Sequence, residues 1–93
     1  MKPTVGRIVH YTSLGDRDGK YPPEVQAALV TKITPHHGER ANAPSQENRF
    51  EVSLRIFYAD GEFNMRDVMF TESPAGTEDA RGKWTWPSRE VAE

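Results

Sequence analysis

Cysteine is absent from this sequence, and that absence removes several classes of protein. Without thiols there is no disulfide framework, no thiolate catalysis and no cysteine-based zinc or iron–sulfur site. Long apolar runs are missing too, because no stretch of about 18 apolar residues occurs and no apolar segment follows the first four residues. Neither a membrane span nor a secretion signal is predicted. We therefore expect a cytoplasmic protein. The absence of cysteine also fits a reducing compartment.

An excess of basic residues is also missing. The chain has 12 Lys and Arg against 14 Asp and Glu, a formal net charge of -2, so binding to double-stranded nucleic acid is not expected. Its 93 residues predict one domain over 1–93. A core of this size supplies only roughly 3–5 kcal/mol of net stability. Because a second copy would add buried surface, we expect a homo-oligomer.

The clearest pattern in the chain is a strict alternation over residues 49–58, where every second residue is apolar. A period of two predicts a strand with one buried face. The dipeptide Asp60-Gly61 follows, and it suits the two positive φ values of a type I′ turn, which predicts a hairpin with a return strand over 62–70. The apolar residues of the return strand change parity. This predicts either a bulge near Arg66-Asp67 or a partner subunit on the outer face.

Other segments are less regular but still have strand composition. Residues 5–12 predict a strand followed by a polar loop, and residues 26–34 predict extended chain. Trp84 and Trp86 would share one face of a last, short strand. Two segments are expected to be irregular: a flexible loop at about 35–48 and a frayed tail at about 88–93.

These elements predict a mostly β fold. Five strands joined by two long loops, a tight turn and another long loop favour a small SH3-like open barrel or a curved antiparallel sheet. The alternative is an α+β fold with one short helix near residues 22–29, because Pro23-Glu24 could open a helix there.

Motifs for catalysis and metal binding are scarce. His36 and His37 lie near Glu39, but adjacent side chains of an extended chain point to opposite sides, and only His10 could add a third imidazole. A solvated loop is therefore favoured over a metal site. No nucleophile, phosphate-loop or metalloprotease motif occurs, so we expect neither an enzyme nor a cofactor.

Aromatic and cationic residues on the predicted strands are the more informative pattern. Aromatic faces stack on bases, and guanidinium groups hold phosphates through paired hydrogen bonds. Together they predict a site for a nucleotide-type ligand. The alternative is that the rings only fill a small core and the arginines are solvated. The residues predicted to bind the ligand are Arg7, His10, Tyr11, Arg55, Trp84 and Trp86.

Three blocks of the sequence carry a resemblance: residues 3–11 (PTVGRIVHY), 27–33 (AALVTKI) and 82–87 (GKWTWP). In these blocks the chain resembles a family of short proteins encoded by bacteriophages and prophages. The resemblance implies an accessory factor that acts by binding. One class of such factors sequesters the cyclic nucleotide signals of bacterial anti-phage defence in pockets between small protomers.

The leading hypothesis at this level is a homo-oligomeric protein that sequesters a cyclic nucleotide immune signal in the cytoplasm of the bacterial host. Two alternatives use the same aromatic residues differently. A protein–protein adaptor or inhibitor would press them against a host protein, and a small structural phage component would use them for self-assembly.

Overall fold

A computed structural model describes residues 2–15 and 22–87 of the chain. These residues form five strands and three short 3-10 helices. Their bounds are β1 Ile8–Thr12, β2 Val25–Pro35, η1 Gly38–Asn42, η2 Glu47–Arg49, β3 Phe50–Tyr58, β4 Gly61–Val68, η3 Glu78–Ala80 and β5 Trp84–Thr85. The predicted mostly β fold is confirmed, and the α+β alternative is wrong, because residues 25–29 belong to β2 and residues 22–24 are not helical.

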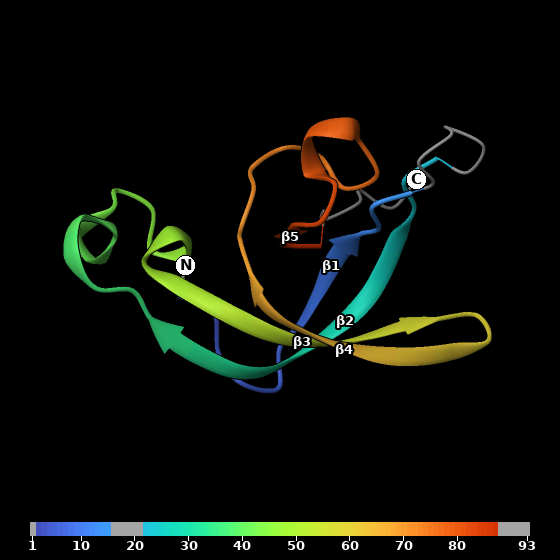
Figure 1. Cartoon of the computed structure of the whole chain (residues 1–93), viewed down its shortest axis with the longest axis horizontal. Coiled ribbons are helices and arrows are strands. Elements are labelled where there is room, and N and C mark those ends of the chain that lie inside the picture. The colour runs from blue at the N-terminus through green and yellow to red at the C-terminus, as the bar shows by residue number, and fades with distance from the viewer. Residues whose placement is uncertain (1, 16–21, 88–93) are drawn as a thin grey trace, which may run out of the picture.

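The five strands form one antiparallel sheet in the order β4-β3-β2-β1-β5. Figure 1 shows β2 bending from the lower left to the upper right, so that β1 and β5 stand above β3 and β4. Backbone hydrogen bonds then link the last strand to the chain after β4: Trp84 N–H donates to Met69 O over 2.9 Å, and Thr71 N–H donates to Trp84 O over 2.9 Å. These bonds bring the two edges of the curved sheet together as a partly closed barrel.

The concave side of the sheet holds the core. Strand alternation places one face of each strand there, and the alternation predicted for residues 49–58 is confirmed in its middle by Val52, Leu54 and Ile56. Trp84 is 0 % exposed at the centre. A buried aromatic of this size dominates a small core, and truncating such a ring to alanine costs about 3–5 kcal/mol. The buried core residues are Val9, Tyr11, Ala28, Val30, Val52, Leu54, Ile56, Val68 and Trp84.

The bulge predicted near Arg66-Asp67 is confirmed. Val52 pairs with Val68 and Leu54 with Met65, so Arg66 and Asp67 together oppose the single residue Ser53. Asp67 has a φ of 56°, in the left-handed region. The extra residue restores the parity of β4, because Met65 and Val68 both reach the core.

The predicted β3–β4 hairpin forms, but its turn differs from the expected one. Tyr58 pairs with Gly61, so the turn residues are Ala59 and Asp60, and neither Asp60 nor Gly61 has a positive φ. The type I′ prediction is therefore wrong. The glycine serves another purpose, because a Cβ at position 61 would lie 2.8 Å from the Tyr58 hydroxyl. Gly61 leaves room for the Tyr58 ring.

Other boundaries also shift. The first strand begins at Ile8 rather than at residue 5, because residues 5 and 6 form a turn in which Gly6 has a φ of 90°. Residues 35–48 contain η1 and part of η2, and their predicted flexibility stays a prediction. The predicted frayed tail and most of the loop at 13–20 lie outside the described residues.

Candidate functional site

Two of the six predicted ligand-binding residues belong to the core. Tyr11 is 1 % exposed and Trp84 is 0 % exposed, and they pair across β1 and β5. The Trp84 ring lies 4.9 Å from the Phe70 ring and 5.0 Å from the Trp86 ring, the latter edge to face at 89°. The Trp84 ring is therefore enclosed by protein and offers no face to a ligand. The alternative role predicted for it, core packing, is the one that the structure gives it.

Arg55 lies apart from the other predicted residues. It alternates with the buried Leu54 and Ile56 along β3, so its side chain points to the convex side of the sheet. There its guanidinium forms an ion pair with Glu62 and donates a hydrogen bond of 3.1 Å to Asn64 Oδ1. Both partners sit on the neighbouring strand β4. Arg55 thus ties two strands together on the side opposite the core.

The remaining three predicted residues do gather. The Arg7 guanidinium lies 5.2 Å from the centroid of the Trp86 ring, within cation–π range. His10 and Trp86 both line a groove of about 530 Å³, which we call the His10 groove. Its lining residues are His10, Val25, Glu72, Ser73, Pro74, Ala75, Thr85 and Trp86.

A buried carboxylate fixes one edge of the Trp86 ring. Trp86 Nε1 donates a hydrogen bond of 2.6 Å to Glu47 Oε2, and Ser45 Oγ donates one of 2.8 Å to Glu47 Oε1. Glu47 is only 8 % exposed. Burial would raise the pKa of its carboxyl, but hydrogen bonds, among them those from Trp86, from its own backbone N–H and from Ser45, outweigh burial and hold the pKa at about 2. The carboxylate is therefore charged at neutral pH and locks Trp86 in place.

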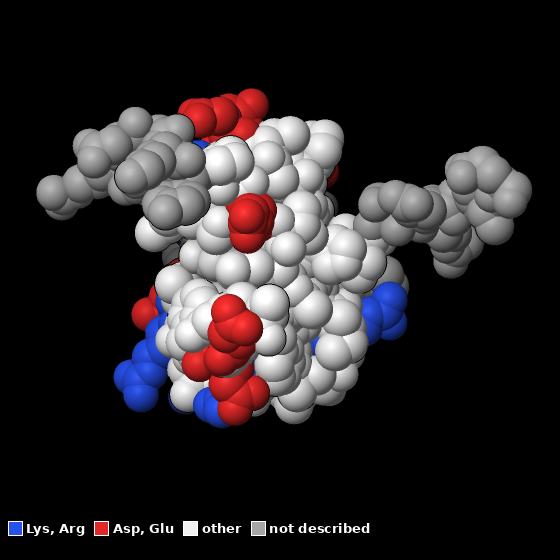
Figure 2. All heavy atoms as spheres, turned by 90° about the vertical axis from the view of Figure 1, so that its right-hand side faces the viewer, with Lys and Arg blue, Asp and Glu red and all other residues white. Residues whose placement is uncertain are grey.

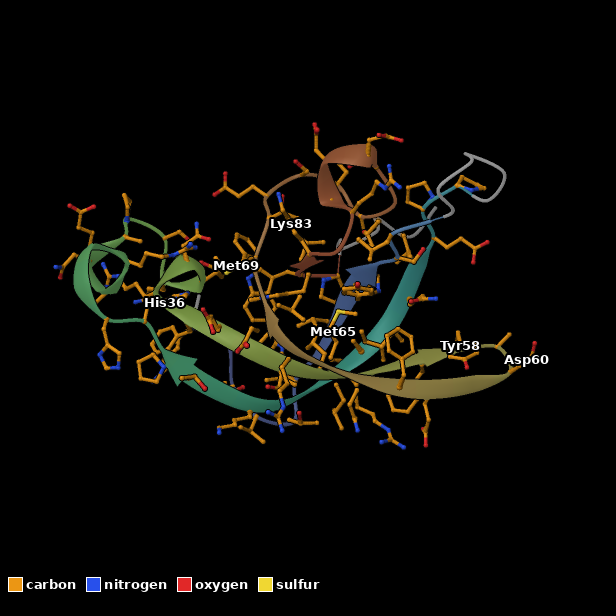
Figure 3. The ribbon with its side chains drawn as sticks, viewed as in Figure 1. His36, Tyr58, Asp60, Met65, Met69 and Lys83 are labelled. Atoms are coloured by element: carbon orange, nitrogen blue, oxygen red, sulfur yellow. The ribbon has the colours of Figure 1, made fainter. Side chains whose placement is uncertain are left out.

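A second groove of about 550 Å³ lies between the start of the β1–β2 connection and the β3–β4 hairpin. We call it the hairpin groove. Figure 3 shows Met65 pointing from β4 into the concave side of the sheet and Tyr58 standing on the hairpin near its tip. Among the six predicted residues only Tyr11 lines it. The lining residues are Tyr11, Ser13, Leu14, Gly15, Pro22, Glu24, Gln26, Tyr58, Phe63 and Met65.

Two exposed aromatic rings form one wall of the hairpin groove. Tyr58 is 47 % exposed and Phe63 is 36 % exposed, and their ring centroids lie 5.9 Å apart with planes tilted by 47°. The floor comes from the paired residues Tyr11 and Gln26 of β1 and β2, together with Met65. The Tyr11 hydroxyl donates a 3.2 Å hydrogen bond to Met65 Sδ, a weak acceptor. Burial raises the pKa of Tyr11 above its ordinary value, so the phenol is neutral at physiological pH.

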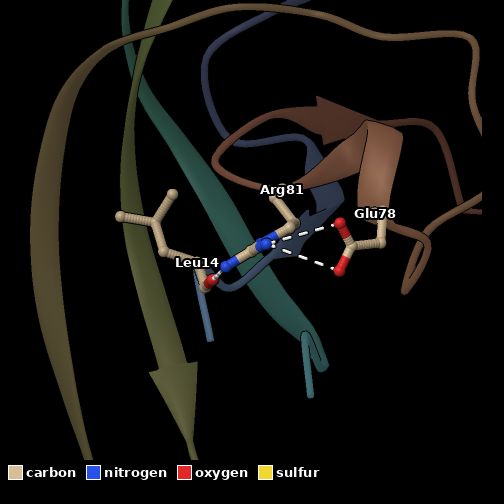
Figure 4. A network of polar contacts seen from close by, with 3 residues as sticks. All are labelled: Leu14, Glu78 and Arg81. Atoms are coloured by element: carbon tan, nitrogen blue, oxygen red, sulfur yellow. Dashed lines mark hydrogen bonds and ion pairs between the residues drawn. The ribbon is translucent and has the colours of Figure 1, made fainter. Parts of the chain in front are cut away.

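The opposite wall is anchored by polar contacts across the chain. Ser13 N–H donates to Glu24 O and Glu24 N–H donates to Ser13 Oγ, each over 2.9 Å. The Arg81 guanidinium, itself paired with Glu78, reaches across from the segment before β5 and donates two hydrogen bonds to the Leu14 carbonyl, one of 2.8 Å from Nε (Figure 4). The groove therefore has both walls fastened to the sheet.

Among the described residues that line the hairpin groove, the only charged one is acidic. Glu24 lines it, and its lining residues include no Lys or Arg. Figure 2 views the end of the molecule that carries the hairpin, and the middle of that face holds acidic and uncharged residues while the basic ones lie at its margins. Because a phosphate is anionic, the described residues in the middle of this face disfavour its binding.

Among the described residues, the side chains around His36 and His37 do not form a cluster that could hold a metal ion. His37 is exposed, as the predicted solvated loop requires. His36 departs from that prediction, because its side chain is 12 % exposed and its Nδ1 lies 3.4 Å from Glu51 Oε1 on β3. The two histidines do point to different surroundings, which the alternation of an extended chain explains.

Tyr58 and Phe63 belong to the aromatic pattern of the predicted strands, but neither they nor Gln26 are among the six residues predicted to bind the ligand. Their positions follow from pairings that join distant segments, such as Tyr11 opposite Gln26, which the sequence does not encode locally. One local signal was present. A two-residue turn places Tyr58 opposite Gly61, and alternation then brings Phe63 to the same face of the hairpin.

No known family model, curated protein or solved structure matches this chain. The resemblance to bacteriophage proteins therefore stays a prediction, and the two grooves are the features of the molecule that bear on its function. Within the described ranges, no helix has the length and apolar character needed to cross a membrane.

Proposed function

We propose that this chain is a non-catalytic binding protein whose hairpin groove receives a segment of another protein. The observation that carries the proposal is the exposed ring pair Tyr58–Phe63, which a paired hairpin holds beside a groove of about 550 Å³. Exposed aromatic residues on a rigid scaffold are the usual energetic centres of protein interfaces, because they bury much area and lose little conformational entropy.

Three features support a protein segment rather than a nucleotide in this groove. The lining is aromatic on one wall, through Tyr58 and Phe63, and the opposite wall carries Leu14 and the Glu24 carboxylate. None of the described lining residues offers a cation for a phosphate. The groove is also open at the surface between two chain segments, which suits an extended peptide better than a fully enclosed small molecule. In the bacteriophage setting that the sequence predicts, the partner is a protein of the host.

The test is a selection of peptides from a random display library on the immobilised protein. Enriched peptides are expected to bind the wild type and to lose at least about ten-fold in affinity on Phe63→Ala, which removes an exposed ring that borders the groove. Phe57→Ala is the matched control, because Phe57 is similarly exposed but alternates to the convex side of β3. No enrichment, or equal loss in both variants, would contradict the proposal.

A second candidate function is the sequestration of a cyclic nucleotide, and one observation favours it. His10 and Trp86 line the His10 groove, the Arg7 guanidinium lies over the Trp86 ring, and Arg7 has no ion pair with any described residue. Its guanidinium is thus available to a phosphate while the Trp86 ring offers stacking area. A homo-oligomer that completes this site stays a prediction as well.

Thermal unfolding with a panel of cyclic di- and trinucleotides tests the second candidate. A nucleotide at 100 times its dissociation constant stabilises the protein by about 2.7 kcal/mol. If the His10 groove binds it, Arg7→Ala abolishes the shift and Arg55→Ala, which removes an arginine on the convex side, leaves it intact. No shift with any nucleotide would remove this candidate.

A further inference from the structure

The chemistry of the hairpin groove goes beyond aromatic area. The Tyr58 and Phe63 rings, tilted by 47° and 5.9 Å apart, form an open corner rather than a flat stack. The face of an aromatic ring carries partial negative charge, so a corner of two rings attracts a positive group placed between them. Each ring is partly exposed at the surface. The pairing of β3 with β4 holds both residues in place, so the corner is formed in the free protein.

The floor of the groove contains a hydrogen-bond acceptor that has no partner. Gln26 Oε1 is buried and has no hydrogen-bond partner among the described residues. An unsatisfied buried carbonyl oxygen carries a cost that a ligand N–H would remove. The neighbouring Tyr11 hydroxyl uses its hydrogen toward Met65 Sδ, which leaves its oxygen lone pairs for another donor.

A carboxylate completes the set. Glu24 lines the groove and is exposed, and its backbone is held by the two hydrogen bonds with Ser13. Its side chain makes no ion pair within the described part of the chain. The described lining residues thus offer aromatic rings, a carbonyl acceptor and a carboxylate, with no Lys or Arg among them. Such a set is complementary to a cation that carries N–H donors.

We propose that the hairpin groove recognises a cationic side chain, the ammonium of a lysine or the guanidinium of an arginine, on the protein segment that docks there. This inference rests on the proposed function for its occupant and adds the chemical class of the residue recognised. The cation sits in the Tyr58–Phe63 corner, its alkyl stem packs on Met65, and Glu24 and Gln26 Oε1 accept its N–H groups.

The test compares two probes that differ only in charge: Nα-acetyl-trimethyl-lysine amide and the analogue in which a neutral tert-butyl group replaces the trimethylammonium. Both are titrated into isotope-labelled protein and followed by amide chemical shifts. The cationic probe is expected to bind about ten-fold more tightly and to shift the amides of Gln26, Tyr58 and Phe63. Equal affinity of the two probes, or shifts elsewhere, would overturn the inference. Nα-acetyl-lysine amide, whose ammonium group has N–H donors, tests the role of Glu24 and Gln26 Oε1 as acceptors in the same titration.

Variants separate the contributions. Tyr58→Leu and Phe63→Leu keep apolar area but remove a π face, and each is expected to lower the affinity for the cationic probe about ten-fold. Glu24→Gln is expected to lower it several-fold and to weaken its dependence on salt, because a screened charge pair is lost. Phe57→Leu and Glu39→Gln are matched controls on exposed positions outside the groove, and affinity is expected to stay unchanged in both.

The inference and the proposed function fail differently. Selected peptides that bind the groove but lack basic residues, or that tolerate replacement of Lys by norleucine, would overturn the inference while the proposed function stands. Binding of the cationic probe without any selected peptide would support the inference and count against a protein partner.

Discussion

At the scale of single residues, Asp67 holds the bulge that brings β4 back into register. Its φ of 56° lies in a region that costs most residues about 1 kcal/mol and β-branched residues more. We expect Asp67→Val to lower the free energy of unfolding by about 1–2 kcal/mol and Asp67→Gly to leave it nearly unchanged, as measured by urea unfolding. Arg66→Val, one residue earlier and also exposed, is the control that carries no positive φ. An Asp67→Val variant as stable as this control would mean that the bulge is not strained.

Also at this scale, neighbours decide which aromatic residues can serve a ligand. Trp84 and Trp86 look alike in the sequence, yet Trp84 is enclosed between Phe70 and Trp86 while Trp86 reaches the surface beside His10. The identity of a ring predicts only that it buries area. Its partner across the sheet determines which of its faces remains free.

At the scale of elements, the Glu47–Trp86 hydrogen bond joins η2 to the residue that follows β5. The pKa of Glu47 is held at about 2, below its ordinary value of 4.5, so its contribution to stability is present above pH 4.5 and is lost as pH falls toward 2. We expect the urea midpoint of the wild type to fall over this window by more than that of Glu47→Gln. Trp86→Phe removes one donor and brings the pKa of Glu47 closer to its ordinary value, so the loss is expected to be smaller and to end at a higher pH.

The control for this pH series is Glu39→Gln, an exposed carboxylate on η1, whose acid profile should follow that of the wild type. Other carboxylates titrate in the same window, so the difference between variant and wild type carries the result. Identical profiles for Glu47→Gln and the wild type would show that Glu47 is not specifically stabilised.

A second connection between elements is the hold of Arg81 on the Leu14 carbonyl, which fastens one wall of the hairpin groove. Gly82 supports the same contact, because a Cβ there would lie 2.8 Å from Leu14 Cδ2. We expect Arg81→Ala to cost about 1 kcal/mol of stability, to speed hydrogen exchange at residues 13–15 and to lower affinity for the cationic probe a few-fold. Arg66→Ala serves as the control, since Arg66 is exposed and outside the groove. Unchanged exchange at residues 13–15 would contradict the role given to Arg81.

At the scale of the whole molecule, local sequence patterns predicted the strands but not which residues of different strands lie side by side. The alternation in β3, the hairpin and the bulge at Arg66-Asp67 were all predictable, because each depends on residues close together in the chain. The turn type was not, since the need for Gly61 comes from the Tyr58 ring rather than from φ.

The candidate site was predicted only in part for the same reason. His10 and Trp86 share a groove and Arg7 contacts the Trp86 ring, but Arg55 lies on the convex side and Tyr11 faces the other groove. Which residues share a groove depends on the β1–β2 and β1–β5 registers, and no local rule fixes a pairing between segments more than 60 residues apart, such as Tyr11 and Trp84. The curved sheet then carries two grooves, whereas the sequence predicted a single ligand site.

The central claim is that a protein segment docks in the hairpin groove. The most direct measurement is a map of amide chemical-shift changes on the labelled protein when a peptide selected from the display library is added. The account predicts that the largest changes fall at residues 11–15, 24–26 and 58–65, which line or border this groove. Changes centred instead on His10 and residues 72–75, or on the convex side around Arg55 and Phe57, would contradict it.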